Sequence, residues 1–199
     1  MAELPPPKPG FLPTGAGAIA VVIGAVVACL LGSALVVFTV VGSSRMHGKS
    51  KSAEAQSNLK AGFAAERSFF AEKDTFSVVI SEIGFSPERG NCYLYAFSSE
   101  GELLEPGKPP IGHVGVKPDS SLHPHVDVAA LERAIPDALW DDVGITGTCP
   151  ECSVTIVAAG NIDDDDTIDV WSISTRDRTI DGTPVTTGQP WHHVDDTAK

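Results

Sequence analysis

The chain has 199 residues, of which 42% are hydrophobic, with 14 lysines and arginines against 26 aspartates and glutamates. The charges are unevenly placed: 10 basic and 25 acidic residues follow Ser52, which leaves that part with a net charge of −15. So acidic a domain repels the phosphates of nucleic acid, and nucleic-acid binding is excluded. The sequence contains no G-x-S-x-G, Walker A or H-E-x-x-H motif, so it indicates neither an enzyme nor a small-molecule substrate.

The first 52 residues divide into three segments. Residues 1–15 are rich in proline and glycine and predict a disordered arm. No charged residue lies between Lys8 and Arg45, and the run from Ala16 to Val41 is almost entirely apolar. At ~1.5 Å per residue this run spans ~39 Å, far more than the apolar part of a cleaved signal peptide, and it predicts a transmembrane helix over residues 16–42. Residues 43–52 form a basic, polar connector.

Small residues recur at every fourth position of the predicted transmembrane helix. This pattern lets helices approach closely in lipid and favours self-association. The stripe consists of Ala16, Ala20, Gly24, Ala28 and Gly32. Three basic residues follow the helix and only Lys8 precedes it, so the positive-inside rule alone would leave the following domain in the cytoplasm.

Residues 53–199 predict an α+β domain that begins with an amphipathic helix. Its stripe recurs near the 3.6-residue period and predicts about five turns ending near Lys73. The stripe consists of Ala55, Leu59, Phe63, Glu66 and Phe70.

Strands are expected after this helix. Cys92–Ser98, Ser153–Ala159 and Thr167–Thr175 are rich in β-branched and aromatic residues and are bounded by turn-forming residues. A short helix over Val128–Ile135 is predicted between them, with Asp127 as its N-cap and Pro136 as its stop. The long helix is expected to bury its stripe against one face of an antiparallel sheet.

Two cysteines lie close together in the stretch Cys149-Pro-Glu-Cys152, a spacing shared by local disulfides, zinc half-sites and redox motifs. The pair opens a strand, whereas a thioredoxin-like site opens a helix, and no second ligand pair stands at a zinc-like spacing. A local disulfide is therefore the favoured interpretation. Cys92 is expected to be a buried free thiol, and the histidines are expected at the surface.

The stretch "GNIDDDDTID" crowds five aspartates into seven residues. Asn161, Asp163, Asp165 and Asp169 fall at relative positions 1, 3, 5 and 9, the alternation with which an EF-hand-like loop directs oxygens at one cation. We therefore predict a Ca²⁺ loop, although glycine is absent from relative position 6 and glutamate from position 12. An aspartate-rich turn without a metal is the alternative.

Two long stretches resemble type IV pilins, particularly the major fimbrial subunits of myxobacteria. They are "AEAQSNLKAGFAAERSFFAEKDTFSVVISEIGFSPERGNCYLYAF", residues 53–97, and "GTCPECSVTIVAAGNIDDDDTIDVWSIS", residues 147–174. The resemblance implies a bacterial envelope protein, a helix laid across an antiparallel sheet, and a role in a pilus or secretion filament. Some pseudopilins of this kind bind calcium in a comparable C-terminal loop.

The N-terminus departs from the pilin pattern. Pilins are cut after a glycine and carry a glutamate five residues into the mature helix, but the fifth residue counted from Phe11 is Gly15, and no acidic residue lies between Glu3 and Glu54. The N-terminus thus lacks a clear prepilin peptidase site. We expect an uncut protein with one inner-membrane crossing, and the resemblance and the cysteines place its C-terminal domain outside the cytoplasm.

The function expected from these features is that of a non-enzymatic, membrane-anchored structural or assembly protein of pilin type. Its partners would be the membrane and other subunits of a filament, including copies of itself. The alternative is a membrane-anchored calcium- or zinc-binding domain outside the cytoplasm that acts as a sensor or interaction module.

Overall fold

A computed structural model describes residues 50–162 and 167–196. These residues belong to one compact unit, Arg45–Lys199. The predicted arm, the transmembrane helix over residues 16–42, its small-residue stripe and most of the connector lie outside the described residues. Within the described residues, no helix combines the length and apolar character that a membrane crossing requires.

The predicted amphipathic helix is present, and its described part covers residues 50–73. Ala55 and Leu59 on its stripe are buried, and Phe63 packs against the same core. Gly62 packs closely on the sheet, because an added Cβ would come within 2.9 Å of the Phe97 ring. The helix ends at residue 73, and Asp74 then takes a left-handed conformation with a φ of 55°.

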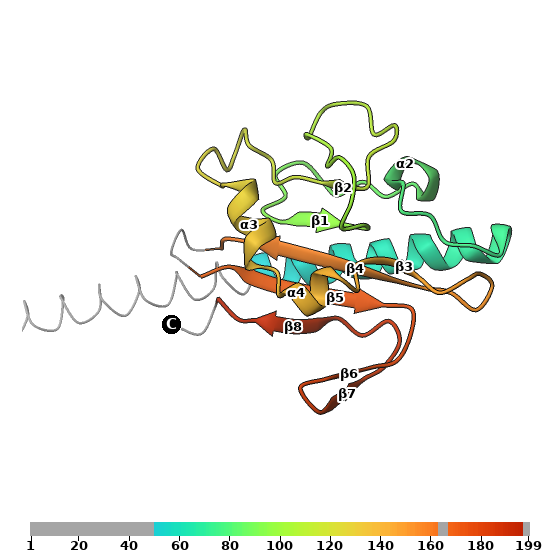
Figure 1. Ribbon diagram of the computed structural model, residues 1–199. Helices are drawn as coiled ribbons and strands as arrows, with labels where there is room; N and C mark the ends of the chain where they lie inside the picture. Colours follow the sequence, from blue (N-terminus) through green and yellow to red (C-terminus); the bar gives the residue numbers. More distant parts are fainter. Residues whose placement is uncertain (1–49, 163–166, 197–199) are drawn as a thin grey trace, which may run out of the picture. The chain divides into compact units, whose positions relative to one another are not determined.

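The main sheet is antiparallel, with strand order β2-β1-β4-β5-β8 and β3 also paired to β4 (Figure 1). Its strands are β1 (Leu94–Ala96), β2 (Gly115–Val116), β3 (Gly144–Thr146), β4 (Ser153–Gly160), β5 (Asp169–Ser174) and β8 (Trp191–Val194). A separate hairpin consists of β6 (Arg178–Ile180) and β7 (Thr183–Val185). The three predicted strands are therefore confirmed as β1, β4 and β5, although β1 is shorter than Cys92–Ser98.

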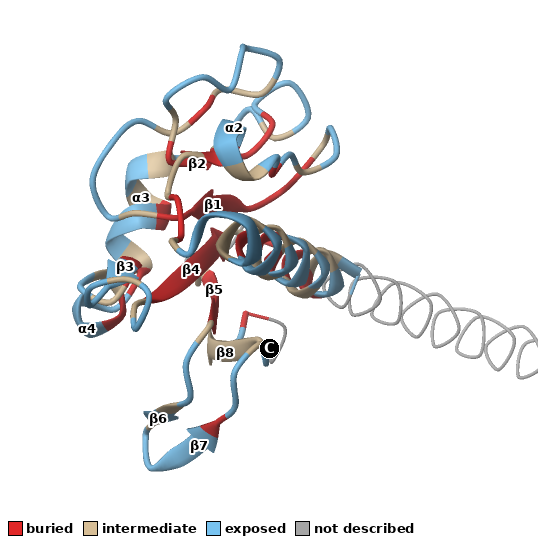
Figure 2. Ribbon diagram, turned by 90° about the vertical axis from the view of Figure 1, so that its right-hand side faces the viewer, coloured by how far each residue is buried: buried red, intermediate tan, exposed pale blue. Residues whose placement is uncertain are grey.

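Both faces of the central strands are covered, which explains why every residue of β4 and β5 is buried. The long helix lies on one side of these strands, and α3 (Val128–Ala134) and α4 (Asp137–Trp140) lie on the other (Figure 2). The helix side contains Leu59, Ile156 and Ile173, whereas Val157 and Val170 pack with Leu131 of α3. The expectation of a helix on one face is confirmed, and the second covered face is additional.

The short helices follow their local sequence. The Asp127 side chain accepts a hydrogen bond from the backbone N–H of Ala129 at 3.0 Å and so caps α3, as predicted. The helix ends before Pro136, which is the N-cap residue of α4. The remaining helix, α2 (Ile80–Ile83), buries Ile80 and ends at Gly84, which has a φ of 72°.

Glu66 is a fully buried acidic residue on the inner stripe of the long helix. Its Oε2 accepts a hydrogen bond from the backbone N–H of Ser77 at 3.3 Å, whereas Oε1 has no hydrogen-bond partner among the described residues. Burial raises the pKa of Glu66 to about 8, and the bond from Ser77 offsets part of that rise. The side chain is therefore largely protonated at neutral pH.

We predict that Glu66→Gln reduces the pH dependence of stability. Unfolded Glu66 ionises near pH 4.5 while the folded form keeps its proton to about pH 8, so the free energy of unfolding falls as the pH rises through this window. Between pH 5 and pH 8 the variant should lose ~1–3 kcal/mol less of its free energy of unfolding than the wild type. Urea unfolding of residues 45–199 measures this loss. Glu132→Gln, at an exposed position of α3, is the control. Parallel pH profiles for the wild type and Glu66→Gln would contradict the prediction.

Candidate functional site

The Asp169 carboxylate, at the start of β5, is fully buried and is the centre of a hydrogen-bond network. Its Oδ2 accepts hydrogen bonds from the Tyr93 hydroxyl at 2.5 Å and from the Trp171 indole N–H at 2.6 Å. Its Oδ1 lies 2.5 Å from His192 Nε2 and accepts a 3.3 Å bond from the backbone N–H of Asp196. Because an ionised carboxylate only accepts hydrogen bonds, Nε2 carries the proton in this contact.

The charge of Asp169 is stabilised by these donors. Burial alone would raise the pKa of Asp169, but the hydrogen bonds from His192, Tyr93 and Trp171 outweigh burial and hold the pKa below its ordinary value. Burial, followed by the charge of Asp169, raises the pKa of Tyr93, so its hydroxyl stays a neutral donor. The His192 ring stacks on the Trp171 indole, with ring centres 3.8 Å apart and planes 11° from parallel.

The network also reaches the long helix. The Ser52 hydroxyl lies 3.5 Å from Asp169 Oδ2, and the Lys51 ammonium donates to the backbone carbonyl of Ile162 at 2.7 Å. Ile162 lies in the connection between β4 and β5. The carboxylate therefore joins the beginning of the described helix, the residue before β1, strand β5 and the C-terminal strand β8.

The predicted calcium ligands do not all lie in the described part of the chain. Asp163 and Asp165 are outside it, and Asn161 is half-buried, so the calcium loop stays a prediction. The fourth residue, Asp169, lies in the interior with both oxygens accepting hydrogen bonds from protein groups. A different combination is close to it: one ligand atom each from Asp169, His192 and Asp195 lie within 4.8 Å of one another.

Sequence reasoning did not find His192 and Asp195. It placed the histidines at the surface, whereas His192 and His193 are half-buried and hydrogen-bonded. Only a long-range contact brings these residues to Asp169: the antiparallel pairing of β5 with β8 sets Trp171 opposite His192. No local spacing in the sequence reveals that pairing.

The predicted disulfide between Cys149 and Cys152 is present, with their Cα atoms 4.4 Å apart in the turn before β4. The Thr75 hydroxyl donates to Cys149 Sγ at 3.3 Å, so this turn contacts the segment that follows the long helix. Cys92 is free and buried, as expected. Burial, followed by the nearby Glu54 carboxylate, raises the pKa of the Cys92 thiol to about 12 and keeps it protonated.

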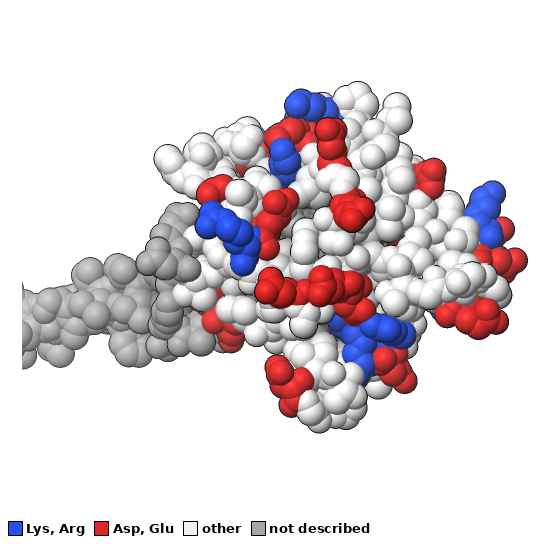
Figure 3. Space-filling view, viewed as in Figure 1, with Lys and Arg blue, Asp and Glu red and all other residues white. Residues whose placement is uncertain are grey.

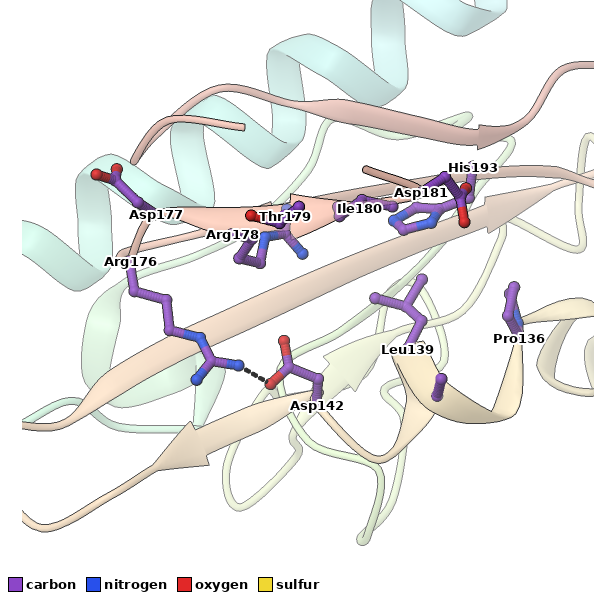
Figure 4. A pocket seen from close by; sticks show the side chains of 11 residues that line it. Pro136, Leu139, Asp142, Arg176, Asp177, Arg178, Thr179, Ile180, Asp181 and His193 are labelled. Atoms are coloured by element: carbon purple, nitrogen blue, oxygen red, sulfur yellow. Dashed lines mark hydrogen bonds and ion pairs between the residues drawn. The ribbon is translucent and has the colours of Figure 1, made fainter. Parts of the chain in front are cut away.

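A pocket of about 740 Å³ lies between α4 and the β6–β7 hairpin (Figure 4). Pro136 and Leu139 form one wall, and Arg178 and Ile180 come from the opposite hairpin. Arg176 and Asp142, which also line the pocket, form an ion pair.

Buried polar groups line the pocket's hairpin side. Arg178 Nε and Nη2 are buried and have no hydrogen-bond partner among the described residues. Burial, followed by the charge of Arg178, lowers the pKa of His193 to about 4, so this ring is neutral at physiological pH. Its Nε2 hydrogen-bonds with the Ser172 hydroxyl at 2.7 Å. The pocket therefore offers guanidinium charge but no protonated histidine.

Comparison with known proteins agrees with this architecture. Residues 46–117 match the family model described as type IV pilin PilA, a range that includes the long helix, α2, β1 and β2. The chain is also 35% identical, over 149 residues, to the type IV major pilin protein PilA of Myxococcus xanthus (strain DK1622), covering 65% of this chain and 67% of that protein.

The chain belongs to the type IV pilin family. The resemblance seen in residues 53–97 is thereby confirmed, since that stretch lies inside the matched range. Membership of the pilin family also indicates an association with membranes or filaments. In this pilin, the Asp169 network joins the long helix of the matched region to the C-terminal strand β8 that lies beyond it.

We predict that Asp169→Asn lowers the free energy of unfolding by about 3 kcal/mol, because the amide loses the charge and turns one acceptor into a donor facing other donors. Asp141→Asn is the matched control, since Asp141 is exposed, and it should change stability by less than ~0.5 kcal/mol. Urea unfolding of residues 45–199 measures both variants. Equal effects of the two substitutions would show that the network contributes little.

Proposed function

We propose that the chain is a non-enzymatic, membrane-anchored structural or assembly subunit of a type IV pilus or a related bacterial filament. Its similarity to a major pilin is the observation that carries this proposal. The fold agrees with it, because one long helix is packed along an antiparallel sheet and keeps its opposite face exposed.

The exposed face of the long helix suits contact with another helix. Along that face the side chains are mostly small, which lets a second helix come close without displacing large groups. The exposed small residues are Ala53, Ser57, Ala61, Ala64, Ser68 and Ala71. We infer that this face packs against other subunits, including copies of this chain.

The surface charge limits how copies can associate. On the face shown in Figure 3, acidic side chains are spread over the domain, with basic side chains in small groups among them. A net charge of −15 after Ser52 makes copies repel one another, although physiological salt screens this beyond ~8 Å. The exposed Lys60 and Arg67 lie among the small residues of the helix, so this face carries basic rather than acidic charge and adds nothing to that repulsion.

The proposed location is the bacterial inner membrane, with residues 16–42 as a single crossing and the domain after it outside the cytoplasm. The Cys149–Cys152 disulfide supports a domain outside the cytoplasm, since such bonds persist in oxidising compartments. The acidic loop at residues 161–169 remains our proposal for a Ca²⁺ site, on the spacing of its oxygen ligands.

We predict that the chain co-isolates with filaments sheared from cells that produce it. Ala64→Trp should reduce the recovered filament at least tenfold, because a large ring on the exposed helix face keeps a second helix away. The amount of the chain in whole cells should stay the same, since Ala64 is exposed and makes no contribution to the core. Immunoblots of sheared and cell fractions measure both quantities.

Ala129→Trp is the matched control, because Ala129 is also an exposed helical alanine but lies on α3. It should leave filament recovery unchanged. A wild-type chain that never enters the sheared fraction while remaining abundant in the membrane would overturn the structural role. Equal losses for both variants would overturn the assignment of the helix face.

A further inference from the structure

Three side chains of metal-ligating type come together beside β8, at the C-terminal end of the described chain. Ligand atoms of Asp169, His192 and Asp195 all lie within 4.8 Å of one another. The three residues are successively more exposed: Asp169 is buried, His192 is half-buried and Asp195 is at the surface. The group therefore extends from the interior to solvent, which gives an ion a route of entry.

We propose that Asp169, His192 and Asp195 bind one divalent transition-metal ion, and that zinc is the ion they suit best. Zinc binds imidazole nitrogens and carboxylate oxygens at ~2.0–2.2 Å, and this group offers one such nitrogen and two such oxygens. Calcium and magnesium take oxygen ligands, so the imidazole discriminates against them. This zinc site differs from the predicted calcium loop in two of its three ligands, and it does not depend on the proposed filament function.

Two of the three ligands are already fixed in orientation. Tyr93 and Trp171 hold Asp169 Oδ2, which leaves Oδ1 directed at His192. The His192 ring is stacked on the Trp171 indole and cannot turn freely. Groups that orient ligands in this way commonly raise metal affinity, because less freedom is lost when the ion binds.

Zinc would replace the proton that now joins two of the ligands. His192 Nε2 and Asp169 Oδ1 are 2.5 Å apart across one hydrogen bond. When zinc binds, Nε2 releases its proton to solvent and Nδ1 takes one up from solvent, so the ring stays neutral, and the Nε2 and Oδ1 lone pairs both bind the ion. Two bonds of ~2.0 Å at a tetrahedral angle need a separation of ~3.3 Å, so the two atoms must move apart by less than 1 Å. Asp195, whose ligand oxygen already lies within 4.8 Å of the other two ligand atoms, would supply the third bond, and water the fourth.

The ion would tie the C-terminal segment to the sheet. Asp169 begins β5, His192 lies in the four-residue edge strand β8, and Asp195 follows that strand. In the structure one hydrogen bond and one ring stack join the His192 side chain to β5. A bound metal adds bonds from three positions and so stabilises the folded pilin domain.

Isothermal titration of the metal-free, full-length chain with zinc chloride tests the proposal. We expect one zinc ion per chain, an increase in melting temperature with zinc relative to chelator, and calcium binding that Asp195→Asn does not weaken. Asp195→Asn and His192→Gln should each weaken zinc binding at least tenfold. Glutamine at 192 can still donate a hydrogen bond to Asp169, and the melting temperature without zinc shows whether each variant folds.

His125→Gln is the matched control, since it removes an exposed histidine remote in sequence from the three ligands and should bind zinc like the wild type. A wild-type chain that binds no zinc at millimolar concentration overturns the proposal. Zinc binding that is unchanged in both Asp195→Asn and His192→Gln overturns it too, because the ion must then lie elsewhere. Calcium that binds as tightly as zinc, and more weakly in Asp195→Asn, also overturns it, because the same three ligands then show no preference for zinc.

Discussion

The buried negative charge of Asp169 joins several segments of the described part of this pilin. An isolated carboxylate in a protein interior costs several kcal/mol, so it is stable only where enough donors surround it. Asp169 receives its donors from Tyr93, Trp171, His192 and the backbone after β8. These groups come from three segments, one before β1, one in β5 and one in and after β8, and the carboxylate is satisfied only when all three are folded around it.

The hydrophobic layers and the hydrogen bonds to Asp169 constrain the fold in different ways. The central strands are buried on both faces, by the long helix on one side and by α3 and α4 on the other. Hydrophobic contacts of this kind are plentiful but tolerate small shifts, whereas hydrogen bonds to one charge require a definite register. Asp169 therefore fixes the register of β8 on β5. The helix, held on its inner face, presents its small residues outward, which is the arrangement that the proposed filament role requires.

The sequence predicted those helices and strands whose patterns arise from residues close together in the chain. The helical period found the stripe of the long helix, the apolar runs found β4 and β5, and Asp127 and Pro136 delimited α3. The strands β2, β3, β6 and β7 have two or three residues each, too few for a period to appear. His192 and Asp195 were missed because only the pairing of β5 with β8 brings them to Asp169. Likewise, the helical period placed Glu66 on the inner stripe but did not show that one of its oxygens would lack a partner.

The central claim is that donors from distant segments act on one carboxylate, and a double-mutant cycle between Tyr93→Phe and His192→Phe tests it most directly, because phenylalanine keeps a ring beside Trp171 but cannot donate to Asp169. Both variants and their combination are unfolded with urea in residues 45–199. If both side chains act through Asp169, the two losses of stability are not additive, and we expect a coupling of at least ~1 kcal/mol. Additivity within ~0.3 kcal/mol would contradict the account, because it would mean that Tyr93 and His192 stabilise the fold independently.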